Sequence, residues 1–105
     1  MKFCILDGEN ITDKEKLHDI LAVSLGFPDW YGMNLDALYD CLTDIREETE
    51  IEIRGIPALE ANLGRTARGL LKVLRDAAEE NAALHLKADW GQEGEAFRVN
   101  PGKPV

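Results

Sequence analysis

Residues 2–6 read Lys-Phe-Cys-Ile-Leu, and Asp7-Gly8 closes the run. Such a short apolar stretch predicts a β-strand buried on both faces, as in a parallel sheet. Residues 49–54 alternate polar and apolar side chains, which predicts a second strand with one solvated face, and residues 83–88 predict a third. Because the intervening stretches are long enough for helical crossovers, the sequence predicts an α/β fold with a three-stranded parallel sheet.

Two helices are predicted between the first and second strands. The first spans about residues 13–25, where Thr12 and Glu15 have the spacing of a capping box and leucines recur at helical intervals. The second spans about residues 35–44, and Asn34 offers a side-chain oxygen that caps its first amides. A segment rich in aromatic residues connects the two.

Two further helices are predicted before the third strand. Pro57 suits the first turn of a short helix that ends at Gly64, because glycine tolerates a left-handed backbone. Thr66 then caps a longer amphipathic helix that extends to Asn81. The sheet is therefore expected to pack with about four helices.

The end of the chain differs in composition from the rest. Residues 91–105 contain several glycines and prolines and show no clear periodicity, which predicts a loosely ordered tail. Phe97 and Val99 are the tail residues able to dock on the domain. We therefore expect one domain over residues 1–90, followed by the tail.

Composition excludes several classes of protein. The chain has 105 residues, with 12 Lys and Arg against 20 Asp and Glu, for a net charge of −8. No stretch is apolar enough for a membrane span, and the first residues are too brief for a signal peptide, so we expect a cytoplasmic protein. Nucleic acid is disfavoured as a partner because phosphate binding needs a basic surface. A basic partner protein is expected instead.

The residues most often used for catalysis form no recognisable motif. Cys4 and Cys41 lie far apart without a metal-binding pattern, and we interpret both as buried, reduced thiols. His18 is expected on the surface of the first helix, and His85 alternates with leucines in the third strand. No glycine-rich phosphate loop precedes a helix. The sequence therefore predicts neither an enzyme nor a bound cofactor or metal.

The second predicted helix has an unusual charge distribution. At 100° per residue its leucines gather on one side, whereas Asp36, Asp40 and Asp44 recur every four residues on the other. Like charges at this spacing cost an isolated helix about 0.2–0.5 kcal/mol per pair. A plain solvated face would explain the row taken alone. The neighbouring aromatic residues, however, favour a binding surface.

Three aromatic side chains accompany this acidic row. Trp30 and Tyr31 come directly before the helix, and Tyr39 lies between Asp36 and Asp40 along the chain. Trp and Tyr commonly anchor protein interfaces, although core packing is an alternative explanation for each one singly. Together with the carboxylates they predict a contact patch for a basic partner.

Residues 27–43, Phe-Pro-Asp-Trp-Tyr-Gly-Met-Asn-Leu-Asp-Ala-Leu-Tyr-Asp-Cys-Leu-Thr, resemble the barstar family of intracellular ribonuclease inhibitors. The resemblance extends over about residues 1–90 and implies a barstar-like fold. It also implies that the loop and second helix enter a nuclease active site, with carboxylates where RNA phosphates would lie and Asp40 as the central phosphate mimic. The partner-binding residues so implied are Trp30, Tyr31, Gly32, Asn34, Leu35, Asp36, Tyr39, Asp40, Thr43, Asp44 and Asp76.

Some of these positions depart from the family pattern. Tyr39 replaces an expected Trp, Asp44-Ile45 replaces a small residue followed by an aromatic one, and Asp76 replaces a Glu. All of these changes fall on the implied contact surface. A cognate enzyme other than barnase, or a partner other than a ribonuclease, therefore stays open.

Three functions remain after this comparison. The leading hypothesis is a cytoplasmic immunity protein that binds a secreted basic ribonuclease one to one and blocks its active site. The second is a protein of the same fold that binds another toxin or a different basic partner. The third is an enzyme in which Asp36 and Asp40 hold a divalent metal or act as acid and base, although no further side chain completes such a site.

Overall fold

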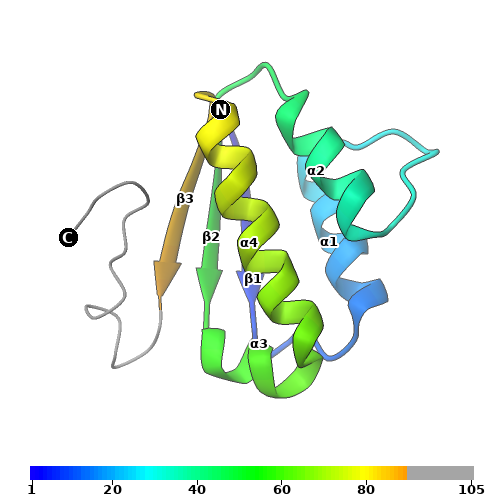
Figure 1. The fold of residues 1–105 in the computed structure, drawn as a ribbon, viewed down its shortest axis with the longest axis vertical. Helices are drawn as coiled ribbons and strands as arrows, with labels where there is room; N and C mark the ends of the chain where they lie inside the picture. Colours follow the sequence, from blue (N-terminus) through cyan, green and yellow to red (C-terminus); the bar gives the residue numbers. More distant parts are fainter. Residues whose placement is uncertain (90–105) are drawn as a thin grey trace.

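A computed structural model of the chain describes residues 1–89. Within them the strands are parallel and neighbour one another in chain order, β1-β2-β3 (Figure 1). The predicted α/β fold with a three-stranded parallel sheet and four helices is confirmed. The predicted tail lies outside the described residues. The elements are β1 Lys2–Asp7, α1 Lys14–Leu25, α2 Leu35–Thr43, β2 Thr49–Arg54, α3 Ile56–Leu63, α4 Arg65–Glu80 and β3 Leu84–Asp89.

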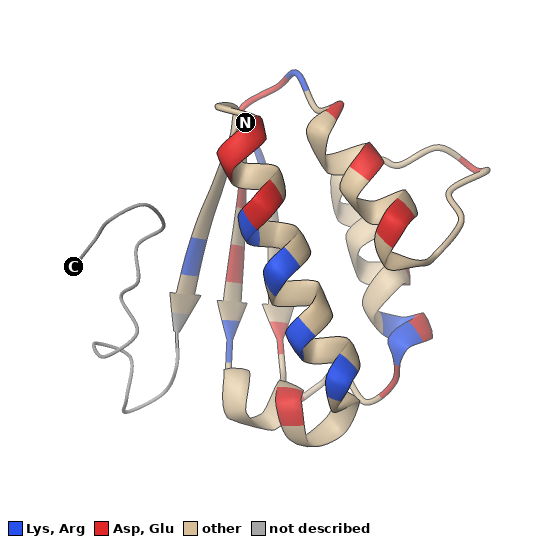
Figure 2. Ribbon diagram, in the orientation of Figure 1, with Lys and Arg blue, Asp and Glu red and all other residues tan. Residues whose placement is uncertain are grey.

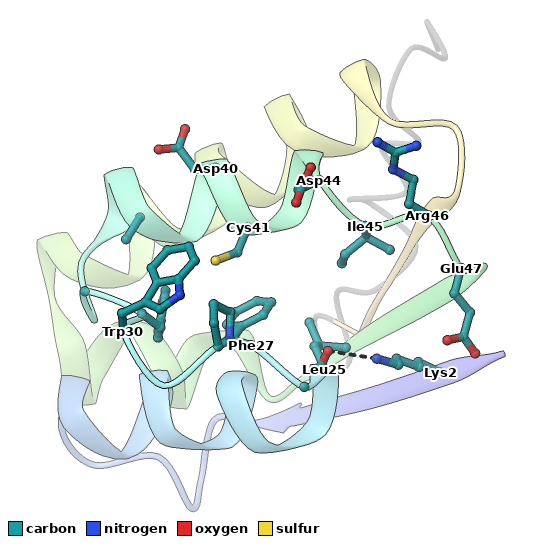
Figure 3. A pocket seen from close by; sticks show the side chains of 15 residues that line it. Lys2, Leu25, Phe27, Trp30, Asp40, Cys41, Asp44, Ile45, Arg46 and Glu47 are labelled. Carbon is teal, nitrogen blue, oxygen red and sulfur yellow. Dashed lines mark hydrogen bonds between the residues drawn. The ribbon is translucent and has the colours of Figure 1, made fainter.

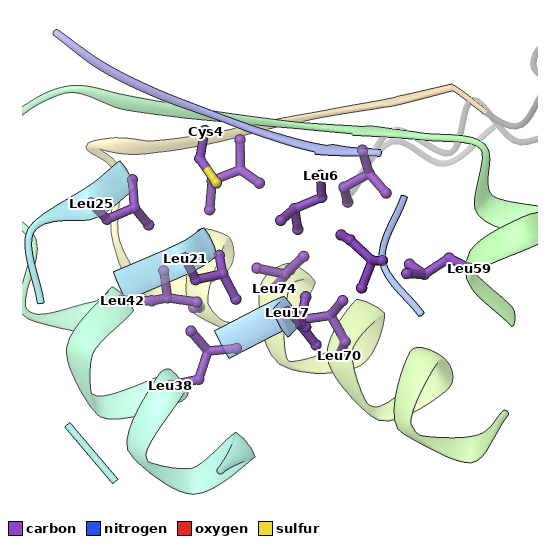
Figure 4. Packing of buried hydrophobic residues seen from close by; sticks show 14 of the residues in the cluster. Cys4, Leu6, Leu17, Leu21, Leu25, Leu38, Leu42, Leu59, Leu70 and Leu74 are labelled. Carbon is purple, nitrogen blue, oxygen red and sulfur yellow. The ribbon is translucent and has the colours of Figure 1, made fainter. Parts of the chain in front are cut away.

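The register of the sheet assigns alternate residues to its two faces. Cys4 pairs with Ile51, which pairs with Leu86, and this row faces the helices. Phe3 and Ile5 lie on the opposite face and are 59% and 46% exposed. The prediction that the first strand is buried on both faces is therefore wrong. Helices α1 and α4 pack against one face only, and α2 packs on α4 on the same side (Figure 4), so the apolar residues Phe3 and Ile5 of the other face are exposed.

The core lies between the sheet and the helices. α1 contributes three leucines, α2 and α4 contribute two each, and α3 closes the end of the sheet at which the strands end (Figures 1 and 4). Each of these helices shows the apolar stripe that its sequence predicts. The principal leucines are Leu17, Leu21, Leu25, Leu38, Leu42, Leu59, Leu70 and Leu74, none of which is more than 3% exposed.

Two of the predicted helix caps are wrong. α1 is capped by Asp13, whose extended backbone (φ −149°, ψ 166°) lets its carboxylate accept from the amide of Lys16 at 2.8 Å, so Thr12 lies outside the cap. α4 begins at Arg65, and Thr66 therefore lies inside its first turn. Gly64 is both the C-cap of α3 and the N-cap of α4, because its positive φ of 57° lets the chain end one helix and begin the next at a single residue. Thr66 therefore comes too late to cap α4.

We predict that Gly8→Ala is strongly destabilising. A Cβ at Gly8 would overlap the carbonyl oxygen of Gly55 and lie 2.8 Å from the amide nitrogen of Leu59, and both neighbours are backbone atoms. The loss in unfolding free energy should reach or exceed the ~1–3 kcal/mol typical of overpacking. Urea denaturation measures it.

Gly26→Ala is the matched control. Gly26 has φ 71°, and a Cβ there would meet only Lys2 Nζ, at 3.2 Å, the far end of a long side chain that donates to Leu25 O. This variant should lose only the roughly 1–2 kcal/mol of left-handed strain. Equal losses in the two variants would show that crowding at Gly8 is unimportant.

Candidate functional site

The loop between α1 and α2 is held at its start by backbone hydrogen bonds. Gly26 takes the left-handed conformation that ends α1, and the amide of Phe27 still donates to Ala22 O at 3.0 Å. The amide of Tyr31 donates to the carbonyl oxygen of Pro28, three residues before it, also at 3.0 Å, which closes a tight turn. This turn leaves Trp30 at the tip of the loop.

Tyr31 is a core residue. Its side chain is 8% exposed, its ring packs 4.9 Å from that of Phe27, and its hydroxyl lies 2.5 Å from His18 Nδ1. Burial lowers the pKa of His18 and raises the pKa of Tyr31, so both groups are neutral at pH 7 and share one hydrogen bond. The expectations of a surface His18 and of an exposed Tyr31 ring are therefore wrong, because each side chain satisfies the other inside the core.

Trp30 has the opposite environment. Its side chain is 79% exposed and borders a hollow beside Phe27 (Figure 3). Tryptophan is enriched at protein interfaces relative to the rest of the surface. Of the two adjacent loop aromatics, Trp30 is thus the one whose ring is accessible to a partner.

The start of α2 is fixed by the predicted cap. Asn34 Oδ1 accepts from the amide of Ala37 at 2.8 Å, and Asn34 Nδ2 donates to Gly32 O at 3.2 Å. Met33 adopts φ 54° between them, an uncommon conformation for a residue other than glycine. Gly32 and Asn34 are both exposed, as their proposed contact role requires.

The far end of α2 is fixed by a residue distant in sequence. Asn81, which ends α4, donates through Nδ2 to the carbonyl oxygens of Leu42 and Ile45, at 2.9 Å each. These carbonyls belong to the last turn of α2 and the residues after it, where a helix leaves carbonyls without regular helical partners. Leu42 O also accepts from the amide of Ile45 at 3.3 Å. Both ends of α2 are therefore anchored by asparagine side chains.

The acidic row lies on the solvent side of α2. Leu38 and Leu42 are fully buried, whereas Asp36, Asp40 and Asp44 are all exposed (Figure 2). Asp36 occupies the first turn, where the helix dipole favours a carboxylate, and Asp44 is the C-cap, where it does not. The row is thus a concentration of negative charge that the helix itself does not neutralise.

The thiol of Cys41 interacts electrostatically with two carboxylates of the acidic row, those of Asp40 and Asp44. Cys41 is only partly buried, whereas Cys4 is 1% exposed. The expectation that both thiols are buried is therefore correct for Cys4 and wrong for Cys41. The pKa of Cys41 is raised by burial first and then by the carboxylates of Asp40 and Asp44, and burial raises the pKa of Cys4. Both thiols are therefore protonated at neutral pH, which makes them poor nucleophiles.

A hollow of about 670 Å³ lies between the aromatic loop and α2. Trp30, Phe27 and Ile45 give it apolar walls, and Cys41 points into it from α2 (Figure 3). Asp40 and Asp44 stand at its acidic rim, with Arg46 and Glu47 beyond them. Lys2 and Arg46 line the hollow at its other end. Only the part beside Asp40 therefore combines apolar walls with negative charge, a combination suited to a long basic side chain.

A second groove of about 470 Å³ separates α2 from α4. It is lined by Asp76 of α4 as well as by residues of the acidic helix, although the Asp76 carboxylate is already bound by Lys72 Nζ at 2.9 Å. Both side chains are largely exposed, so this ion pair is weak and can exchange for a partner's cation. The groove is lined by Leu35, Asp36, Tyr39, Asp40, Lys72, Val73 and Asp76.

The predicted site residues therefore divide into two groups. Tyr31 is buried, and the Thr43 hydroxyl donates its proton within α2 to Tyr39 O at 2.9 Å, which leaves it only as an acceptor for a partner. Sequence reasoning missed Lys72, although its spacing from Asp76 was visible, and it missed Cys41 as part of the hollow. The residues brought together on one accessible face are Trp30, Gly32, Asn34, Leu35, Asp36, Tyr39, Asp40, Asp44 and Asp76.

Neither a cluster of metal-binding side chains nor a helix able to span a membrane occurs among the described residues. Within residues 1–89, no three His, Cys, Asp or Glu side chains gather closely enough to hold a metal ion. In the same part of the chain, no helix has the length and apolar character that crossing a membrane requires.

Comparison with known proteins identifies the family. A family model described as barstar (barnase inhibitor) matches residues 1–101. The chain belongs to the barstar family. The barstar match continues past residue 90, where the resemblance found from the sequence ended. A Bacillus subtilis (strain 168) protein named "Putative ribonuclease inhibitor YrdF" is 40% identical over 81 residues, which cover 76% of this barstar-family chain and 89% of the relative.

We predict that Tyr31→Phe destabilises this barstar-family domain by about 1–3 kcal/mol, because it leaves His18 Nδ1 buried without its hydrogen-bond partner. Urea denaturation measures the change in unfolding free energy. Tyr39→Phe is the control, since Tyr39 is only partly buried and its loss should be well under 1 kcal/mol, roughly the range of surface changes. An unchanged stability of Tyr31→Phe would contradict the role assigned to this hydrogen bond.

The lowered pKa of His18 also predicts a pH dependence of stability. The unfolded chain protonates His18 near pH 6.5, whereas the folded chain resists protonation to lower pH, so this contribution is complete above pH 6.5 and is lost below it. His18→Gln keeps an acceptor for Tyr31 but cannot titrate. The stability advantage of the wild type over this variant should shrink between pH 7.5 and pH 5.5, about one unit on either side of the ordinary histidine pKa. Denaturation at both pH values tests this, and a constant difference would contradict it.

Proposed function

We propose that the protein inhibits a basic ribonuclease by covering its active site with α2 and the loop before it. The observation that carries this proposal is the geometry of the acidic row, in which Asp36 and Asp40 lie exposed beside a groove while the leucines of the same helix are buried. Membership of the barstar family and the name of the Bacillus subtilis relative support it.

The charge of the row explains how such inhibition would work. A ribonuclease active site gathers cationic side chains to bind RNA phosphates, and Asp40 with Asp36 presents carboxylates about 6 Å apart, since they lie one turn apart on a helix. Occupation of the active site by these carboxylates excludes the substrate. Opposite charges also accelerate encounter at low salt, because long-range attraction guides the two proteins together.

The aromatic loop adds apolar contact to this attraction. Trp30 is the largest exposed side chain of the loop, and it borders the hollow whose rim carries Asp40 and Asp44. A lysine or arginine of the nuclease could place its apolar stem against Trp30 and its charged end at the rim. We assign the specificity of binding to this combination.

The mechanism needs neither catalysis nor a cofactor. The inhibitor would bind one nuclease molecule, because α2 and the loop form one contiguous face. In this interpretation the protein serves as a cytoplasmic immunity protein that protects its cell from the ribonuclease. If the partner is another basic toxin, the same face would bind it.

The test is the inhibition of barnase and of a panel of related microbial ribonucleases, each titrated with the purified protein at low and at physiological salt. We predict stoichiometric inhibition of at least one of these enzymes, with slower association as salt rises because the attraction is screened. Absence of inhibition across the panel would contradict the ribonuclease proposal and favour a different basic partner.

Variants test the role assigned to the acidic row. Asp36→Asn with Asp40→Asn should weaken inhibition by at least about 2 kcal/mol, or about thirtyfold in Kd, because two buried cations of the nuclease would lose their partners. Glu9→Gln with Glu15→Gln is the control, which removes the same charge from exposed residues that line neither the hollow nor the groove. Equal inhibition by both double variants, each still folded, would exclude the acidic row as the contact.

A further inference from the structure

The solvent side of α4 carries a row of basic side chains, which we call the basic row. Its members, Arg65, Arg68, Lys72 and Arg75, are all exposed, and at 100° per residue they lie within an arc of about 80° on the helix surface. The chain has no Asp or Glu from residue 61 to residue 75. Although the net charge of the chain is −8, four of its 12 Lys and Arg residues are therefore gathered on one face of one helix.

The basic row does not stabilise α4. A helix dipole favours negative charge in the first turn, yet Arg65 and Arg68 lie there and no acidic residue accompanies them. Consecutive members of the row are three or four residues apart, a spacing at which like charges repel each other. Within residues 1–89 the row takes part in one ion pair, that of Lys72 with Asp76, and its three arginines make none. The charges of these arginines are therefore available to a partner.

The basic row lies beside the acidic row of α2. The two helices run in the same direction, because Leu35 Cδ1 lies so near Gly69 that a Cβ there would be 2.7 Å from it, and Asn81 binds the carbonyl oxygens at the other end of α2. Figure 2 shows the red segments of α2 next to the blue segments of α4. Packed helices have axes about 8–10 Å apart. The surface of the two helices therefore consists of a negative strip and a positive strip side by side.

A ribonuclease bound to the acidic row must also lie over the basic row. A specific interface buries about 800 Å² on each partner, which corresponds to a patch roughly 28 Å across. This width is much larger than the separation of two packed helices. Basic side chains on that part of the ribonuclease would be repelled by the basic row, whereas acidic side chains would be attracted. The basic row therefore affects which ribonuclease binds.

We propose that the basic row binds acidic side chains that border the active site of the ribonuclease, and thereby selects the ribonuclease that the protein inhibits. This inference rests on the proposed inhibitor function and adds the charge pattern of the partner, a cationic active site with an acidic border on one side. Repulsion of ribonucleases without such a border contributes to specificity. RNA fits the surface less well, because Asp36 and Asp40, one helix away, repel its phosphates.

Charge reversal in the basic row tests this contact with barnase and the same panel of ribonucleases. For an enzyme that the wild type inhibits, Arg68→Glu with Arg75→Glu should raise Kd at least about tenfold above that of the control, because two attractions become repulsions. The control is Lys16→Glu with Lys87→Glu, which changes the net charge equally at exposed residues that line neither the hollow nor the groove. Arg68→Glu places a carboxylate in the first turn of α4, where the dipole favours it, and thermal unfolding of each variant checks that it is folded.

The complementary change in the ribonuclease is a stricter test. The acidic side chains beside its active site are replaced by Lys one at a time, and Kd is measured with the wild-type inhibitor and with Arg68→Glu plus Arg75→Glu. At least one replacement should weaken binding of the wild type and improve binding of the variant at least about fivefold, because reversing both partners of an ion pair restores the attraction. If every replacement affects the two inhibitors equally, the basic row has no acidic partner on the enzyme.

Three further results would overturn the inference, and they differ in what they leave intact. Equal Kd values for the basic-row variant and the control would exclude the basic row as a contact and leave the proposed inhibitor function unaffected. Absence of inhibition by the wild type across the panel would contradict the proposed function, and this inference with it. Binding of single-stranded RNA by the wild type but not by Arg68→Glu with Arg75→Glu, at unchanged Kd for the ribonuclease, would assign the basic row to RNA.

Discussion

The burial of Leu38 and Leu42 is the constraint on which the candidate site depends. These side chains face the core between α1 and α4, and a helix that buries them must present the opposite side to solvent. Asp36 and Asp40 lie on that opposite side. The hydrophobic effect therefore orients the carboxylates, although none of them contributes to the core.

This orientation has an energetic cost that the fold carries locally. Carboxylates one turn apart repel each other, and Asp44 at the end of α2 also opposes the helix dipole. Each of these effects is at most about 1 kcal/mol, small beside the burial of two leucines, at about 1.5–3 kcal/mol each. A cationic partner would relieve the repulsion, so the same charges that weaken the isolated helix would strengthen a complex.

The sequence predicted the parts of the structure that follow from periodicity and missed those that depend on distant neighbours. Three strands, four helices and the acidic face of α2 all follow from residue spacing. The partnership of His18 with Tyr31 does not, because each residue alone fits a surface position and only the folded chain places them together. The exposure of Phe3 was missed for a similar reason, since an apolar strand does not reveal on which of its faces helices pack.

The side chains of Asn34 and Asn81, which hydrogen-bond to the backbone at the two ends of α2, affect the entropy of binding to a partner. Asn34 holds the first turn and Asn81 holds the last, so the helix is already ordered before a partner arrives. A recognition element that is disordered when unbound loses conformational entropy on association, and that loss reduces the affinity. Here the loss has already occurred during folding, which leaves more of the interaction energy between α2 and its partner available as binding free energy.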